Sequence, residues 1–249
     1  MNVVQKTSFT TYRRIFVFLL QIRRASYMLE RIRLVKDVIS DDDDEPNIVY
    51  YVRHRLLWFV TTLYHYVAEI VLATATMRMR KSLQEATDVD EMIEVHCNYI
   101  VQLEDQILLS KKLTPIYQAI VSLLDMAILF FDTYTTHAGQ QAYDMSNRSQ
   151  NLSASILQSR RQRRCRVEGN GSSSDDDSGE DETRDNSYVS FQEETYLERL
   201  QKMKGRFEQL CSFVSAGLRG VARAGGQSCW EVLAEKLEWG IEKSTGTVI

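Results

Sequence analysis

The chain has 249 residues, of which 44% are hydrophobic and 26% are charged, and its formal net charge is -4. These proportions are ordinary for a globular protein. With only 2 Pro and 11 Gly, the chain has few of the breakers that many short strands and tight turns require, so helices are favoured.

The small net charge hides a strong segregation along the chain. Residues 1–36 carry eight basic residues against one acid, whereas residues 168–185 carry eight acids and one arginine. The total charge therefore says little about partners, because the local fields have opposite signs.

Cysteine usage and apolar runs predict a soluble intracellular protein. The four cysteines form no CxxC pair and have no histidine at metal-ligand spacing, so we expect reduced thiols, no metal and no cofactor. The run 15–20 is too short for a cleavable signal. The run 116–131 falls short of the roughly 20 apolar residues of a membrane-spanning helix.

Apolar periodicity predicts helices along most of the chain. The first, at about residues 12–38, ends before the acidic run 41–45 and Pro46. A second spans about 48–81, and a third begins near Asp88, with Glu91 in a capping arrangement. A fourth helix begins at Thr114-Pro115 and is expected to stop at Gly139. A fifth begins near Tyr196, and the last begins at Ser228. The first helix has a predicted inner stripe of Tyr12, Ile15, Phe16, Leu19, Ile22 and Leu29.

A polar segment separates the fourth and fifth helices. The basic cluster 160–166 precedes a Gly-, Ser- and acid-rich tract that cannot bury enough apolar surface to offset its ordering entropy. We expect a helical bundle at 1–139, a disordered basic and acidic insertion at 140–190, and helices that complete the bundle at 191–249. The predicted fold is all-α, a bundle of about five to six helices with a long disordered acidic insertion.

Three ordered segments resemble gamma-tubulin complex components. They are Tyr12-Arg-Arg-Ile-Phe-Val-Phe-Leu-Leu-Gln-Ile-Arg-Arg-Ala, Arg53-His-Arg-Leu-Leu-Trp-Phe-Val, and Leu83-Gln-Glu-Ala-Thr-Asp-Val-Asp-Glu-Met-Ile-Glu-Val-His-Cys-Asn-Tyr-Ile. The tail, 207–237, resembles the end of the same domain more loosely, and its closing part is most similar to accessory members such as component five. Complete members are several times longer, so the sequence is similar to part of their C-terminal domain, as expected of a fragment or a truncated gene model.

The resemblance implies a non-enzymatic function. It implies a helical domain that binds gamma-tubulin, within a microtubule-nucleating complex that contains other such components. The implied location is the cytoplasm and cytoskeleton, at the microtubule organising centre or spindle pole body. The alternatives are a general helical scaffold and a peripheral membrane protein, because the first helix combines an apolar face with basic residues.

Arginines are the candidate partner-binding residues, because tubulins are acidic. We name Arg13, Arg14, Arg23, Arg24, Arg53 and Arg55. The competing interpretation is a solvated helix face or pairing within the chain. Nucleic-acid binding is disfavoured by the acidic runs and by the lack of a recognition fold.

Other polar groups have structural interpretations. His96 lies on an apolar stripe and is expected to be a packed core residue, and His65 with Glu69 lacks the further ligands that a metal requires. Four serines each have an acid three residues on, which suits an acid-directed kinase. These phosphorylation candidates are Ser172, Ser173, Ser174 and Ser178.

Overall fold

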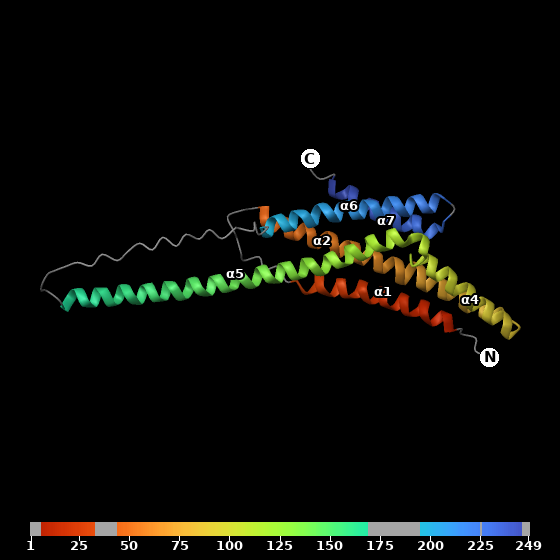
Figure 1. Cartoon of the computed structure of the whole chain (residues 1–249), viewed down its shortest axis with the longest axis horizontal. Coiled ribbons are helices and arrows are strands. Elements are labelled where there is room, and N and C mark those ends of the chain that lie inside the picture. The colour runs from red at the N-terminus through yellow and green to blue at the C-terminus, as the bar shows by residue number, and fades with distance from the viewer. Residues whose placement is uncertain (1–5, 33–43, 169–194, 225, 246–249) are drawn as a thin grey trace, which may run out of the picture. The chain divides into compact units, whose positions relative to one another are not determined.

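The described part of the chain is almost entirely helical. The computed structural model describes residues 6–32, 44–168, 195–224 and 226–245 (Figure 1), and these contain no strand. The prediction of an all-α chain is confirmed. In chain order the elements are α1 (Lys6–Arg31), α2 (Asp44–His65), the π-helical segment η1 (Tyr66–Ala73), α3 (Thr74–Glu85), α4 (Val89–Gln106), the 3₁₀ segment η2 (Lys111–Leu113), α5 (Thr114–Glu168), α6 (Tyr196–Arg223) and α7 (Ser228–Thr245).

The predicted helix at 48–81 is present as α2, η1 and α3, which follow one another without a break. Pro46 lies in the first turn of α2, where the missing N–H of a proline costs no helical bond. At the start of α4, Asp88 holds the N-cap position without a side-chain cap bond. Glu91 instead accepts the backbone N–H of Thr87 at 2.9 Å.

The helix that begins at Thr114 does not stop at Gly139, and that predicted end is wrong. It continues to Glu168, so the predicted insertion is helical as far as this residue. A single glycine costs a helix only about 1 kcal/mol, and no proline interrupts the segment after Pro115. The acidic tract that follows lies outside the described residues.

The chain divides into two units. Met1–Asp132 and Leu197–Ile249 form the first, and Thr133–Tyr196 forms the second. In the second unit, the ring of His137 stacks on Tyr196 with centroids 3.7 Å apart. The predicted domain boundaries at residues 139 and 190 stay a prediction.

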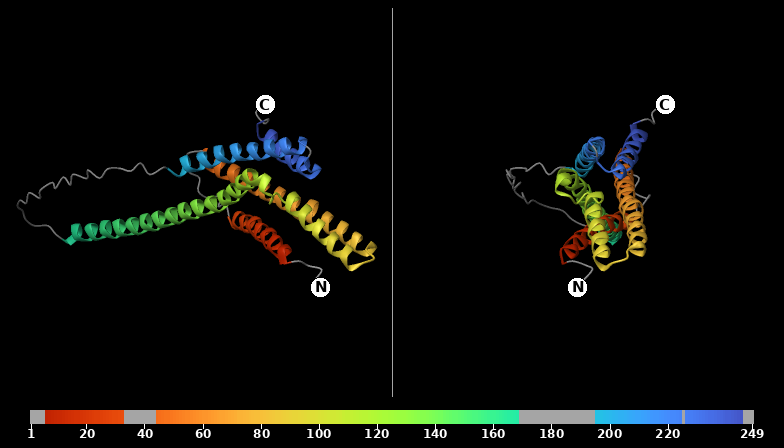
Figure 2. Two further views of the ribbon diagram at one scale, coloured as in Figure 1. Left: turned by 45° about the vertical axis from the view of Figure 1, so that its right-hand side comes forward. Right: turned by 90° about the vertical axis from the view of Figure 1, so that its right-hand side faces the viewer.

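The first unit is a bundle with one apolar core. α1 packs against α2 and α4, and α7 packs against α2 and η1 (Figures 1 and 2). α6 joins α2 through an edge-to-face contact between Phe207 and Phe59 at 6.3 Å. Fully buried side chains from five helices fill the core, among them Phe18, Leu56, Phe59, Leu123, Phe130, Phe207 and Leu233.

The π-helical segment fixes the end of α4. Its first residue, Tyr66, is fully buried and donates its hydroxyl hydrogen to the backbone carbonyl of Gln106 at 2.7 Å. A π-turn inserts a residue into an α-helix and re-aims the side chains around it. Tyr66 thereby ties the second long helix to the turn that leaves α4.

Two helical stretches, Asn47–Glu85 and Val89–Gln140, are long and apolar enough to cross a membrane by length and composition alone. Core helices of soluble proteins pass the same test, and α2, α3 and α4 all pack against neighbours. The expectation of no transmembrane segment therefore stays a prediction.

Candidate partner-binding surface

The six candidate arginines separate into two groups by their surroundings. Arg14, Arg53 and Arg55 direct their guanidinium groups to acceptors within the chain. Arg13, Arg23 and Arg24 are exposed on α1. The sequence groups the six only by residue type, whereas the structure shows that three of them bond within the chain and three are exposed.

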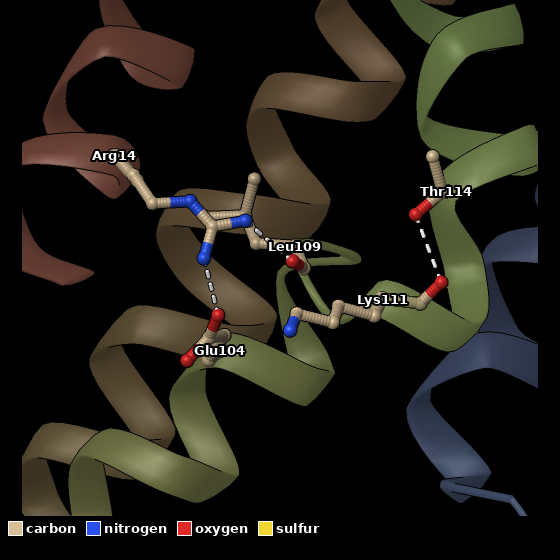
Figure 3. Close-up of polar contacts among 5 residues, drawn as sticks. All are labelled: Arg14, Glu104, Leu109, Lys111 and Thr114. Carbon is tan, nitrogen blue, oxygen red and sulfur yellow. Dashed lines mark hydrogen bonds and ion pairs between the residues drawn. The ribbon is translucent and has the colours of Figure 1, made fainter.

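Arg14 joins α1 to the end of α4. Its guanidinium donates to the Glu104 carboxylate and, at 2.6 Å, to the backbone carbonyl of Leu109 (Figure 3). α4 ends there in a Schellman turn: Leu109 N–H bonds to the Glu104 carbonyl, and Leu108 N–H to that of Asp105. Leu108 occupies the left-handed position, with φ of 68°. Arg14 therefore binds the acceptors that this turn exposes.

Arg53 and Arg55 connect α2 to its neighbours. Arg53 Nε donates to the Leu29 carbonyl of α1 at 3.1 Å. Arg55 is only 7% exposed and donates to the Gly240 carbonyl of α7. Its guanidinium also lies 5.1 Å from the ring centroid of Trp58 and 5.4 Å from that of Phe207. A buried cation held by a carbonyl and two rings is a packing element and not a surface for a partner.

The three exposed arginines lie on one side of α1. Arg13 and Arg24 are eleven residues apart, close to three helical turns, so their side chains project in nearly the same direction. Neither makes a polar contact with another described residue. Arg23 lies 4.2 Å from the ring centroid of Tyr64 in α2. This side of α1 is thus basic and accessible.

Large apolar side chains lie on the same side of α1, before, between and after these arginines. Phe9, Phe16, Leu20 and Tyr27 are 62%, 60%, 50% and 56% exposed. The assignment of Phe16 to the inner stripe is therefore wrong. We call these four residues, together with Arg13, Arg23 and Arg24, the α1 outer seam.

The opposite face of α1 is buried, so α1 is apolar on two sides. Ile15, Phe18, Ile22 and Leu29 are each at most 4% exposed. A search for one apolar stripe merges two stripes in such a helix. Treating residues 9, 16, 20 and 27 as one helical stripe and residues 15, 18, 22 and 29 as another would have revealed the two apolar sides.

The remaining candidate groups have structural roles. His96 is buried, and its Nε2 lies in hydrogen-bond contact with the Tyr12 hydroxyl at 3.1 Å, as expected of a core histidine. His65 contacts Glu69 at 2.6 Å, and the described residues contain no cluster of three metal-binding side chains.

The serine candidates Ser172, Ser173, Ser174 and Ser178 lie outside the described residues.

The comparison with protein families decides to which family the chain belongs. The family model described as gamma tubulin complex component C-terminal matches residues 2–240. The chain belongs to this family. The resemblance seen in three short segments thus extends over nearly the whole chain, including α6 and most of α7.

Two relatives carry the name gamma-tubulin complex component 5. The chain is 26% identical to the Macaca fascicularis protein over 153 residues, which cover 51% of the chain and 21% of the relative. It is 26% identical to the Mus musculus protein over 161 residues, which cover 55% of the chain and 16% of the relative. This family member is therefore similar to component five and spans only a small part of the length of these relatives.

Proposed function

We propose that the chain is a non-enzymatic gamma-tubulin-binding part of a microtubule-nucleating complex. Within that complex it acts beside other gamma-tubulin complex components, at the microtubule organising centre or spindle pole. The match of the family model to residues 2–240 is the observation that carries this proposal.

We place the contact with gamma-tubulin on the α1 outer seam. Arg13, Arg23 and Arg24 present positive charge, and complementary charge accelerates association and orients an acidic partner. Arg14, Arg53 and Arg55 are left out of this surface because their guanidinium groups are engaged within the chain.

A pull-down with purified gamma-tubulin tests the function. It compares this chain with a version extended upstream in its reading frame, because the relatives are much longer. We expect the extended version to bind. If a folded extended version retains no gamma-tubulin, the protein is a helical scaffold of another kind and the proposal is wrong.

Charge reversal tests the surface separately. Arg13→Glu/Arg24→Glu is expected to weaken binding at least about tenfold, and more at low than at high salt. The matched control is Arg199→Glu/Arg206→Glu, which reverses two exposed charges on α6. Equal loss in both variants would point to total charge and not to α1.

A further inference from the structure

We infer that the α1 outer seam is a docking track for one amphipathic α-helix of the partner, with acidic residues beside its apolar stripe. This inference deepens the proposed function and rests on it for the identity of the partner. The recognition chemistry itself follows from the spacing, the width and the charge of the seam.

The spacing of the seam is that of a coiled-coil stripe. Phe9, Phe16, Leu20 and Tyr27 follow one another at intervals of seven, four and seven residues. Arg13 and Arg23 occupy the intervening positions of the same three-and-four pattern. A partner helix packs along such a pattern by inserting its side chains between these knobs.

The width of the seam favours a helix over a membrane surface. At about 100° per residue, the four apolar side chains of the seam project within about 40° of one another. Val17 is also exposed, at 45%, but it projects to one side of this stripe, beyond Arg13 and Arg24. An apolar face that enters a bilayer or a broad core is at least about 100° wide, whereas a narrow stripe is typical of a two-helix contact. Arg13 and Arg23 also interrupt the stripe at positions that a lipid-facing surface would keep apolar.

The charge of the seam specifies the occupant. Arg13, Arg23, Arg24 and Arg31 lie on or beside it, and Arg31 places its guanidinium 5.6 Å from the Tyr27 ring centroid. Glu30 is the one acid of α1. A second copy of this chain would bring arginines against arginines in either orientation, which disfavours self-pairing. The complement is a helix with Glu or Asp beside its apolar residues.

The seam lies on a helix that is already ordered. The opposite face of α1 is buried against α2 and α4 along its length. A partner helix therefore meets a rigid track, and association does not have to order α1.

The experiment uses a designed peptide as the probe. It has Leu at the core positions of four heptads and Glu at the flanking positions, and a second peptide replaces each Glu by Lys. Fluorescence anisotropy measures the binding of each to the folded chain. We expect the Glu peptide to bind and the Lys peptide to bind at least about tenfold more weakly.

Variants locate the binding on the chain. We expect two double variants, Phe16→Ser/Leu20→Ser and Arg13→Glu/Arg24→Glu, each to bind the Glu peptide at least about tenfold more weakly than the wild type. The arginine variant should also bind the Lys peptide more tightly than the wild type does. Phe213→Ser is the apolar control, since Phe213 is 50% exposed on α6. Arg199→Glu/Arg206→Glu is the charge control. Circular dichroism melts confirm that every variant is folded.

Several results would overturn the inference. These are no binding of the Glu peptide, equal binding of both peptides, or unchanged binding by the seam variants. A membrane-binding seam would also overturn it: the chain would sediment with phosphatidylserine vesicles, the seam variants would not, and neither peptide would bind. So would self-association: light scattering would show a dimer of the chain that the seam variants do not form.

A parallel assay with gamma-tubulin separates the two proposals. If gamma-tubulin binds the chain and the seam variants bind it equally well, the docking track is wrong and the function stands. If the Glu peptide binds the seam and the folded extended version does not bind gamma-tubulin, the function is wrong and the docking chemistry stands.

Discussion

At the scale of single residues, the contact between Gly240 and Trp58 shows how closely α7 approaches α2. A Cβ atom at Gly240 would overlap the Trp58 ring at Cζ2 and Cη2. Arg55, one turn before Trp58, donates to the carbonyl of Gly240 itself. The absence of a side chain and the buried cation together set the spacing of the two helices.

Replacing Gly240 by alanine is expected to lower the free energy of unfolding by about 1–3 kcal/mol, because the clash outweighs the gain in helix propensity. Urea denaturation followed by circular dichroism measures the change. Gly220→Ala in α6 is the matched control, since a Cβ there meets nothing within 4 Å. Gly220→Ala should raise the free energy of unfolding by about 0.5–1 kcal/mol. An equal gain from Gly240→Ala would show that α2 and α7 are not packed this closely.

Cys211 predicts a pH dependence of stability. Burial raises the pKa of its thiol to about 11 from the ordinary 9.0, although the nearby Arg55 guanidinium lowers it. Above pH 9.0 the unfolded chain loses this proton before the folded chain does. The contribution of Cys211 is thus complete below pH 9.0 and is lost as the pH rises to about 11. The slope reaches at most about 1.4 kcal/mol per pH unit.

Denaturation midpoints at pH 8, 9 and 10 in the wild type and in Cys211→Ala test this linkage. The variant is expected to be less stable at every pH and to lose less stability as the pH rises. Other groups that lose protons in this range in the unfolded chain, the tyrosines among them, are common to both proteins. Parallel slopes would mean that the Cys211 thiol ionises as easily in the folded chain as in the unfolded one.

At the scale of secondary-structure elements, neighbouring residues of α1 have different surroundings. Arg14 docks α1 on the Schellman turn of α4, while Arg13 lies on the exposed seam. Adjacent helical residues project about 100° apart, which is enough to place one on the bundle and the other in solvent. Arg13 and Arg14 therefore have different environments although they are neighbours in the sequence.

A double-mutant cycle on Arg14 and Glu104 measures the docking of α1 on α4. The side chains are 46% and 32% exposed, so solvent screens their ion pair, and a coupling of about 0.5–1 kcal/mol is expected. Arg14→Ala should cost more than Glu104→Ala, because it also removes the hydrogen bond to the Leu109 carbonyl. The control Arg13→Ala should change stability by less than about 0.5 kcal/mol. Equal effects of Arg13→Ala and Arg14→Ala would contradict this docking.

At the scale of the whole molecule, the first unit draws its core from both ends of the sequence. Leu200, Phe207 and Leu233 are buried as completely as Phe18 and Leu56. The intervening unit, Thr133–Tyr196, is a separate cluster. The helices that carry the seam and its support therefore belong to one folding unit made of two chain segments.

Replacement of Thr133–Tyr196 by a Gly/Ser linker of about 25 residues is expected to leave the first unit folded. Shortening this connection lowers the closure cost by roughly 0.8 kcal/mol, so the stability should change by less than about 2 kcal/mol. Chemical denaturation and the near-ultraviolet spectrum of the tryptophans provide the measurements. Loss of cooperative unfolding would mean that the second unit contributes to the core.

The sequence by itself determined the class of the fold and the family, because apolar periodicity and short motifs are local properties of the chain. The helix that begins at Thr114 was predicted at its start and missed at its end, since one glycine is too weak a signal to stop a helix.

The arginines depended on the tertiary structure. Arg14 meets Glu104 across 90 residues and Arg55 meets Gly240 across 185, and no spacing rule connects residues so far apart. Nor could periodicity decide which of the two apolar stripes of α1 faces the bundle. That choice depends on the helices against which α1 packs, which is why Phe18 is buried and Phe16 lies on the outer seam.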